Sequence, residues 1–230
     1  MPGKNLTRDE AAARARILTV ETYDVRLDLT TGPQHFHTVS TVHFSCSEPG
    51  ADSFIDLIAG SVQRVMLNGE ELDPATVFAD SRVSLPDLAA DNVLVVDATG
   101  DYTNTGEGLH RFVDPVDNEV YLYTQFEVPD SRRMYAVFEQ PDLKASFAFT
   151  VTAPAHWKIV SNSPTPTPKP AGVADGVERS TWSFAPTQRI SSYITALIAG
   201  PYDEVRDQVE TRKGVVPLGI FCRRSLTEHL

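Results

Sequence analysis

The sequence predicts an all-β domain, a large saddle-shaped antiparallel β-sandwich that carries one short amino-terminal helix. Three observations indicate this fold class. Apolar and polar residues alternate with a period of two over many segments, turn residues separate these segments at short intervals, and helical patterning occurs only before residue 18 and in the last six residues. The chain has 230 residues, of which 41% are hydrophobic and 22% charged, as in an ordinary folded domain.

The predicted helix lies at the amino terminus. Thr7 and Glu10 have the spacing of a capping box, and the alanine-rich run that follows favours a helix over about residues 8–17. Arg14 lies near the carboxyl end of this helix, where the helix dipole favours a cation. We expect residues 1–17 to form a helical leader on the surface of the domain.

Period-two alternation then predicts a series of strands. In the first strand, Tyr23, Val25 and Leu27 alternate with charged residues, and a Gly32-Pro33 turn leads to the second strand. The dipeptide Asn68-Gly69 is a hairpin signal. The expected strand segments cover residues 19–30, 36–46, 61–72, 92–102, 119–127, 145–154, 156–162, 180–186, 191–205 and 215–224.

The segment 161–176, "SNSPTPTPKPAGVADG", is rich in proline and threonine. Its prolines favour an extended backbone that cannot donate to a sheet ladder, a composition also found in domain linkers and PxxP ligands. Because strand-like segments lie on both sides of it, we interpret it as a long hairpin loop.

The last residues, "SLTEHL", have the pattern of a helix start, with Ser225 and Glu228 at capping-box spacing. A helix of this length is not stable alone, since about 12–15 residues are needed even for good helix formers. We therefore expect a fragment, with a leader at 1–17, a β-sandwich domain at 18–223 and the start of a further element at 224–230.

Charge and cysteine content exclude several partners. The formal net charge is −11 and no Lys/Arg stripe with interleaved aromatic residues occurs, so we expect no nucleic-acid partner. No segment has signal-peptide character or the length of a membrane span, which predicts no membrane partner and a cytoplasmic location. Cys46 and Cys222 are far apart in sequence and form no disulfide framework.

The sequence contains no recognisable catalytic or metal-binding motif of its own. His35, His37 and His43 share one strand face by parity, but there is no HExxH pair and no Cys/His cluster with zinc spacing. A Gly-x-Ser-x-Gly elbow, a phosphate-binding loop and a singled-out pair of glycosidase carboxylates are also absent. We expect this chain to contain no catalytic residue and to bind no metal.

The strand predicted at 119–127 carries an amide and a carboxylate side by side. Alternation puts Gln125 and Glu127 on one face and Leu122 and Phe126 on the other, which can pack into a core. Spacing alone favours a structural role for Glu127, either solvated at a strand end or paired with one of the two arginines that follow.

An ordered set of motif residues surrounds this pair. They are Gly108, Leu109, Tyr121, Thr124, Gln125, Glu127, Arg132, Phe138, Glu139, Pro141, Lys144, Ala145 and Phe147. The pattern resembles the amino-terminal domain of the zinc aminopeptidase family, which includes aminopeptidase N and leukotriene hydrolase. The later segments "SNSP", "WSFAPT" and "SSYITALIAGPY" are similar to further landmarks of that family, so the resemblance covers most of the chain from about residue 17 onward.

The resemblance implies a saddle-like all-β domain that covers one wall of the active site of a zinc-dependent aminopeptidase. By analogy, Glu127 binds the free α-amino group of a peptide substrate together with the glutamate of a Gly-x-Met-Glu-Asn motif, and Gln125 lines the pocket for the first side chain. The zinc ligands and the Gly-x-Met-Glu-Asn motif belong to a following catalytic domain in the family. We therefore expect zinc in the full-length enzyme, none bound by this fragment, and no activity of the fragment alone.

One departure from the family pattern limits which residue roles can be inferred from relatives. Glu139-Gln140 stands where the family often has Asp-Glu. We therefore infer neither a salt bridge nor a catalytic role for this supporting element. Arg132 and Arg133 are expected to support the loop after the strand. Two alternatives remain open: a noncatalytic β-sandwich interaction module and an epoxide hydrolase relative within the same family.

Overall fold

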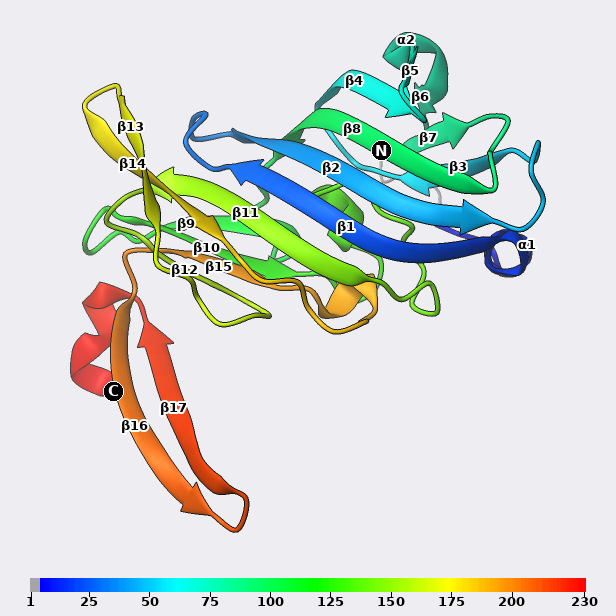
Figure 1. The fold of residues 1–230 in the computed structure, drawn as a ribbon. Helices are drawn as coiled ribbons and strands as arrows, with labels where there is room; N and C mark the ends of the chain where they lie inside the picture. Colours follow the sequence, from blue (N-terminus) through cyan, green and yellow to red (C-terminus); the bar gives the residue numbers. More distant parts are fainter. Residues whose placement is uncertain (1–4) are drawn as a thin grey trace.

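The computed structural model describes residues 5–230, which are mainly β-strands (Figure 1). The largest sheet has eight strands. In spatial order they are β13 (Lys169–Ala174), β14 (Val177–Ser183), β11 (Ser146–Pro154), β1 (Leu18–Asp28), β2 (His35–Cys46), β8 (Asp91–Asp101), β4 (Ser61–Leu67) and β5 (Glu70–Leu72). Its pairs are antiparallel except β1 and β11, which run parallel.

Three smaller sheets accompany the large one. The four-stranded sheet has the order β12 (Lys158–Ser161), β15 (Leu197–Gly200), β10 (Val120–Gln125) and β9 (Gly108–Val113). The three-stranded sheet has the order β3 (Ser53–Asp56), β7 (Arg82–Leu85) and β6 (Phe78–Ala79), and β16 (Asp203–Thr211) pairs with β17 (Gly214–Cys222). The α-helices are α1 (Arg8–Ile17) and α2 (Pro74–Val77), and the 3₁₀ helices are η1 (Ser131–Arg133), η2 (Ser192–Ile194) and η3 (Arg224–His229).

The core lies where the large sheet covers the four-stranded sheet (Figure 1). Alternate residues of β1 are buried, as the period-two pattern predicts, and Tyr23 stacks on Phe147 with ring centroids 4.7 Å apart. The Tyr23 hydroxyl accepts a hydrogen bond from the backbone N–H of Phe138, 3.1 Å away. The predicted all-β sandwich with one short amino-terminal helix is confirmed.

Local sequence signals are confirmed where they depend on near neighbours. The capping box of α1 forms in both directions, with Glu10 N donating to Thr7 Oγ1 at 3.2 Å and Thr7 N donating to Glu10 Oε2 at 2.8 Å. Asn68 and Gly69 have φ values of 54° and 87°, and they join β4 to β5 in a two-residue hairpin turn.

Other predicted boundaries were wrong. Residues 191–205 are not one strand, because η2 and β15 come first and the chain turns at Gly200-Pro201 before β16. Residues 161–176 are not one hairpin loop, because β13 forms within them as the edge strand beside β14, where Pro170 is tolerated. The last turn is the 3₁₀ helix η3, and the Ser225 hydroxyl donates to Asp114 Oδ2 at 2.5 Å instead of capping a helix.

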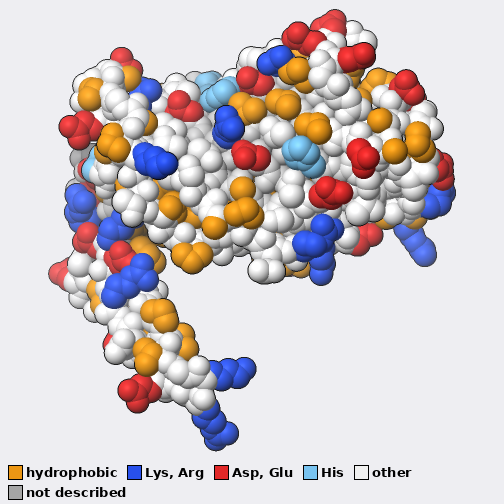
Figure 2. Space-filling model, in the orientation of Figure 1, with side chains coloured by type: hydrophobic (Ala, Val, Ile, Leu, Met, Phe, Trp, Pro, Cys, Tyr) orange, Lys and Arg blue, Asp and Glu red, His pale blue; other side chains and the backbone are white. Residues whose placement is uncertain are grey.

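The hairpin of β16 and β17 projects from the rest of the molecule (Figure 1). Its apolar side chains include Val205, Val215, Leu218 and Ile220, which are all exposed, and Figure 2 shows hydrophobic side chains along the hairpin. Within the described part of the chain, no helix combines the length and the apolar composition that crossing a membrane requires.

Candidate functional site

The two predicted site residues lie where β10 ends. Gln125 is the last residue of β10 and pairs with Gly108 of β9, whereas Glu127 is the first residue of the turn that follows. The expected strand at 119–127 therefore ends two residues early. Both side chains are exposed, and within residues 5–230 neither has a hydrogen-bond or ion-pair partner.

The two faces of β10 differ from the simple alternation. Leu122 and Phe126 are buried in the core as predicted, with exposed fractions of 0% and 3%. Tyr121 is buried as well, because Tyr202 packs edge-on against its ring and its hydroxyl donates to Asp117 Oδ2 at 2.6 Å. The solvent face of the strand thus begins only at Tyr123, which stacks on His110.

The arginines that follow Glu127 have other partners. The guanidinium of Arg133 contacts Asp130 at 2.6 Å and Glu107 at 3.2 Å. Arg132 donates to the carbonyl oxygen of Pro129 at 3.0 Å. Both arginines support the turn, as expected, and the ion-pair alternative for Glu127 does not occur. A carboxylate that is exposed and has no partner among residues 5–230 is available to a cation from outside.

Gly108 explains one element of the motif physically. Its φ is +64°, and a Cβ placed on it would lie 2.7 Å from Cβ of Arg133. A side chain at this position would therefore meet both a left-handed backbone and the arginine that supports the turn. The absence of a side chain lets β9 approach Arg133 closely at Gly108. Gly108 is also the residue that pairs with Gln125 of β10.

We expect Gly108→Ala to lower the free energy of unfolding by about 1–3 kcal/mol, because it adds steric overlap to backbone strain. Urea denaturation followed by circular dichroism measures the change. Gly106→Ala is the matched control, because Gly106 has φ of +86° but no atom lies within 4 Å of the place that a methyl group would occupy. This variant should lower the free energy of unfolding by only about 1 kcal/mol. Equal losses in the two variants would contradict the close-approach explanation.

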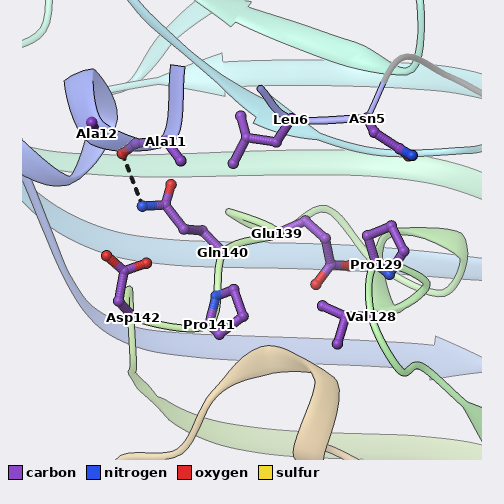
Figure 3. A pocket seen from close by; sticks show the side chains of 10 residues that line it. All are labelled: Asn5, Leu6, Ala11, Ala12, Val128, Pro129, Glu139, Gln140, Pro141 and Asp142. Atoms are coloured by element: carbon purple, nitrogen blue, oxygen red, sulfur yellow. Dashed lines mark hydrogen bonds between the residues drawn. The ribbon is translucent and has the colours of Figure 1, made fainter. Parts of the chain in front are cut away.

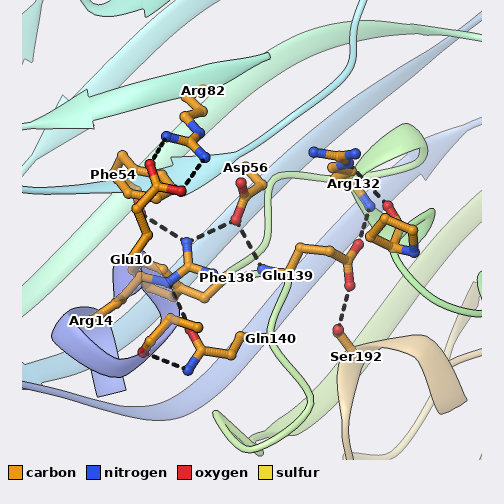
Figure 4. Close-up of polar contacts among 12 residues, drawn as sticks. Glu10, Arg14, Phe54, Asp56, Arg82, Arg132, Phe138, Glu139, Gln140 and Ser192 are labelled. Carbon is orange, nitrogen blue, oxygen red and sulfur yellow. Dashed lines mark hydrogen bonds and ion pairs between the residues drawn. The ribbon is translucent and has the colours of Figure 1, made fainter. Parts of the chain in front are cut away.

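A buried carboxylate anchors the turn that carries Glu127. Glu139 is 5% exposed, and its Oε2 accepts hydrogen bonds from the Ser131 hydroxyl and from Arg132 N, the latter at 2.8 Å. Its Oε1 accepts from the Ser192 hydroxyl at 2.7 Å (Figure 4). Burial raises the pKa of Glu139, and the hydrogen bonds from Ser131 and Ser192 oppose that rise. Sequence analysis assigned this residue only to a supporting element.

The role of Arg14 could not be predicted from its place in the sequence, because its side chain is buried although α1 lies on the surface. Its Nη1 lies 2.8 Å from Asp56 Oδ2, and its Nε donates to Gln140 Oε1 at 3.1 Å (Figure 4). The guanidinium also packs over the ring of Phe54, 4.8 Å from its centroid. The helix-dipole interpretation gave no hint of this ion pair, because Asp56 is 42 positions away.

A cavity of about 430 Å³ lies between α1 and this turn (Figure 3). Val128 and Pro129 line it on one side and Ala11 on another, and Gln140 closes part of it by donating to Ala11 O at 2.9 Å. A second cavity, of about 470 Å³, has an aromatic lining that includes Tyr123. Neither Gln125 nor Glu127 lines these two cavities.

The histidines do not assemble a metal centre. His35 and His37 each lie 2.6 Å from an aspartate on β8, Asp101 and Asp97 respectively. Among the residues that the structure describes, no group of three or more His, Cys, Asp or Glu side chains could hold a metal ion.

Comparisons with known proteins agree with the motif. The Peptidase M1 N-terminal domain matches residues 19–194. Aminopeptidase N of Streptomyces lividans is 58% identical over 234 residues, which cover 100% of this chain and 26% of that protein. Aminopeptidase N of Acetobacter pasteurianus is 29% identical over 176 residues, which cover 75% of this chain and 46% of that protein.

A third relative, aminopeptidase N of Lactobacillus delbrueckii subsp. lactis, is 26% identical over 214 residues, which cover 90% of this chain and 23% of that protein. The chain thus spans about a quarter to a half of the length of these curated relatives. The family match covers β1 to η2 and therefore includes the turn with Glu127. The chain belongs to the Peptidase M1 N-terminal domain family.

Proposed function

We propose that this chain is the part of a zinc-dependent aminopeptidase that binds the amino group of the substrate. The observation that carries the proposal is the exposed Glu127 carboxylate, which has no partner within residues 5–230 and follows a core strand inside the family motif. The enzyme removes amino-terminal residues from peptides, and Gln125 lines the pocket for the first side chain.

The chemistry of this site favours a peptide with a free amino terminus. An ammonium ion gains a charge-assisted hydrogen bond with the carboxylate, whereas an internal amide nitrogen carries no charge. Once a bound substrate has displaced water, leaving one member of such a pair without its partner costs about 3–5 kcal/mol. The net charge of −11 adds a field that attracts cationic ligands.

The remainder of the enzyme completes the proposal. Zinc and its ligands belong to a catalytic domain that follows the sandwich, and this domain is the principal partner of the present chain. In this proposal the leader spans residues 1–17, of which 1–4 lie outside the described residues. The sandwich spans 18–223, and 224–230 belong to the next element. The two free cysteines, Cys46 and Cys222, support a reducing, cytoplasmic location.

The test compares two chromogenic amides in the full-length protein. Alanine p-nitroanilide is expected to be hydrolysed at least about a hundredfold faster, in kcat/KM, than its N-acetylated form, because acetylation removes the ammonium that Glu127 binds. Residues 1–230 alone should hydrolyse neither compound. Equal rates on the two amides, or turnover by residues 1–230, would contradict the proposal.

The same assay separates the alternatives. A noncatalytic interaction module would release no p-nitroaniline from either amide. An epoxide hydrolase relative would open an epoxide substrate in a parallel assay, and the present proposal expects peptide hydrolysis to be the main activity.

A further inference from the structure

The Glu139 carboxylate connects the two segments that flank β10 and its neighbour β15. On one side it accepts hydrogen bonds from Ser131 and Arg132 in η1, which follows β10. On the other side it accepts from Ser192 in η2, which precedes β15. These strands pair directly, with Leu122 opposite Ala199. The carboxylate therefore ties together the ends of two neighbouring strands.

The donors explain why an acidic residue suits this position. Two hydroxyls and one backbone N–H point at the carboxylate, and a carboxylate accepts at both oxygens without presenting a donor of its own. Burying its charge is costly, and three hydrogen bonds offset part of that cost. Charge-assisted bonds of this kind are roughly twice as strong as neutral ones, so the connection is rigid.

Glu127 lies in a turn that is held by buried residues on both sides along the chain. Before it, Phe126 is 3% exposed and its carbonyl accepts from Asp130 N at 3.1 Å, which closes the turn. After it, Ser131 is fully buried at 0% exposure and bound to Glu139. Because the Glu127 side chain has no partner within residues 5–230, the backbone of this turn fixes its Cβ and thereby the region that its carboxylate can reach.

We propose that Glu139 is a positioning residue that acts through Glu127: its hydrogen bonds to the turn and to η2 hold the Glu127 carboxylate where it meets the amino group of the substrate. This inference rests on the proposed function of Glu127. It predicts that loosening the turn weakens recognition of an ammonium group without removing any atom that touches the substrate.

The test uses the full-length protein and two competitive inhibitors, alaninamide and propionamide, which differ only in the amino group. The inhibition constant of propionamide divided by that of alaninamide measures the preference for an amine. Glu139→Gln places an amide nitrogen among hydrogen-bond donors, and Ser131→Ala removes one hydrogen bond. Each variant should lower this ratio about tenfold. In substrate kinetics, KM should rise by a similar factor while kcat changes less than about twofold.

Ser191→Ala is the matched control. The Ser191 hydroxyl is also buried, but it donates to Pro141 O at 2.6 Å and not to Glu139. This variant should keep the amine preference within about twofold even if its thermal midpoint falls as much as that of Ser131→Ala. A drop in preference as large as that of Ser131→Ala would show that loss of stability alone explains the effect, and would overturn the inference.

A Glu127→Gln background separates the inference from the proposed function. There, Ser131→Ala should cause no further change in amine preference, because the residue through which it acts is already disabled. If Glu127→Gln itself leaves the preference intact, the proposed function fails. If Glu127→Gln abolishes the preference but Glu139→Gln and Ser131→Ala retain it, only the inference fails.

Should Ser131→Ala not fold, Ser192→Ala removes a hydrogen bond on the other side of the same carboxylate, and its amine preference is interpreted in the same way.

Discussion

Glu127→Ala in the full-length enzyme is expected to lower kcat/KM for substrates with a free amino terminus by two to three orders of magnitude. Under the proposed function, the substrate ammonium would lose the carboxylate of Glu127 after binding has displaced water, which costs about 3–5 kcal/mol. The loss applies to ground state and transition state alike, so most of it should appear in KM. Steady-state kinetics with a series of alanine p-nitroanilide concentrations measure it.

The controls separate charge from general damage to the surface. Asp142 is also an exposed acidic residue close to the turn, and Asp142→Ala should change kcat/KM less than about twofold. Glu127→Gln keeps the shape but removes the charge, and should lose nearly as much as alanine. Unchanged kinetics in Glu127→Ala would contradict the proposed role of Glu127 in binding the substrate.

Arg14→Ala is expected to lower the free energy of unfolding by about 3–5 kcal/mol. The Arg14 and Asp56 side chains are only 1% and 0% exposed, and removal of the arginine leaves the aspartate buried without its counter-ion. Asp56 also accepts a hydrogen bond from the backbone N–H of Glu139 at 3.1 Å. Urea denaturation with a linear extrapolation measures the loss.

Arg16 provides a control on the same helix. Its side chain is 69% exposed and lies 3.7 Å from Glu48, so Arg16→Ala should cost no more than about 1 kcal/mol. The double variant Arg14→Met with Asp56→Asn removes both buried charges but keeps an oxygen for Glu139 N. It should be more stable than Arg14→Ala, because no unpaired charge remains. A double variant less stable than the single one would argue against the uncompensated-charge explanation.

What the sequence predicted correctly depends on neighbours a few positions apart. The alternation of Tyr23, Val25 and Leu27 reflects the two faces of one strand, and the Asn68-Gly69 turn follows from backbone conformations that these two residues tolerate. The capping box of Thr7 joins residues three positions apart. The ordered motif around Gln125 gave the family, since so many residues in order rarely match by chance.

The tertiary structure decided the features that join distant parts of the chain. Strand β10 ends at Gln125, and Glu127 belongs to a turn whose far side is held by Glu139 and Ser192. Arg14 finds its counter-ion 42 positions away, and β1 pairs in parallel with β11. Sequence spacing does not encode these contacts, because they form only when the core packs and buried charges and hydrogen-bond donors must find partners.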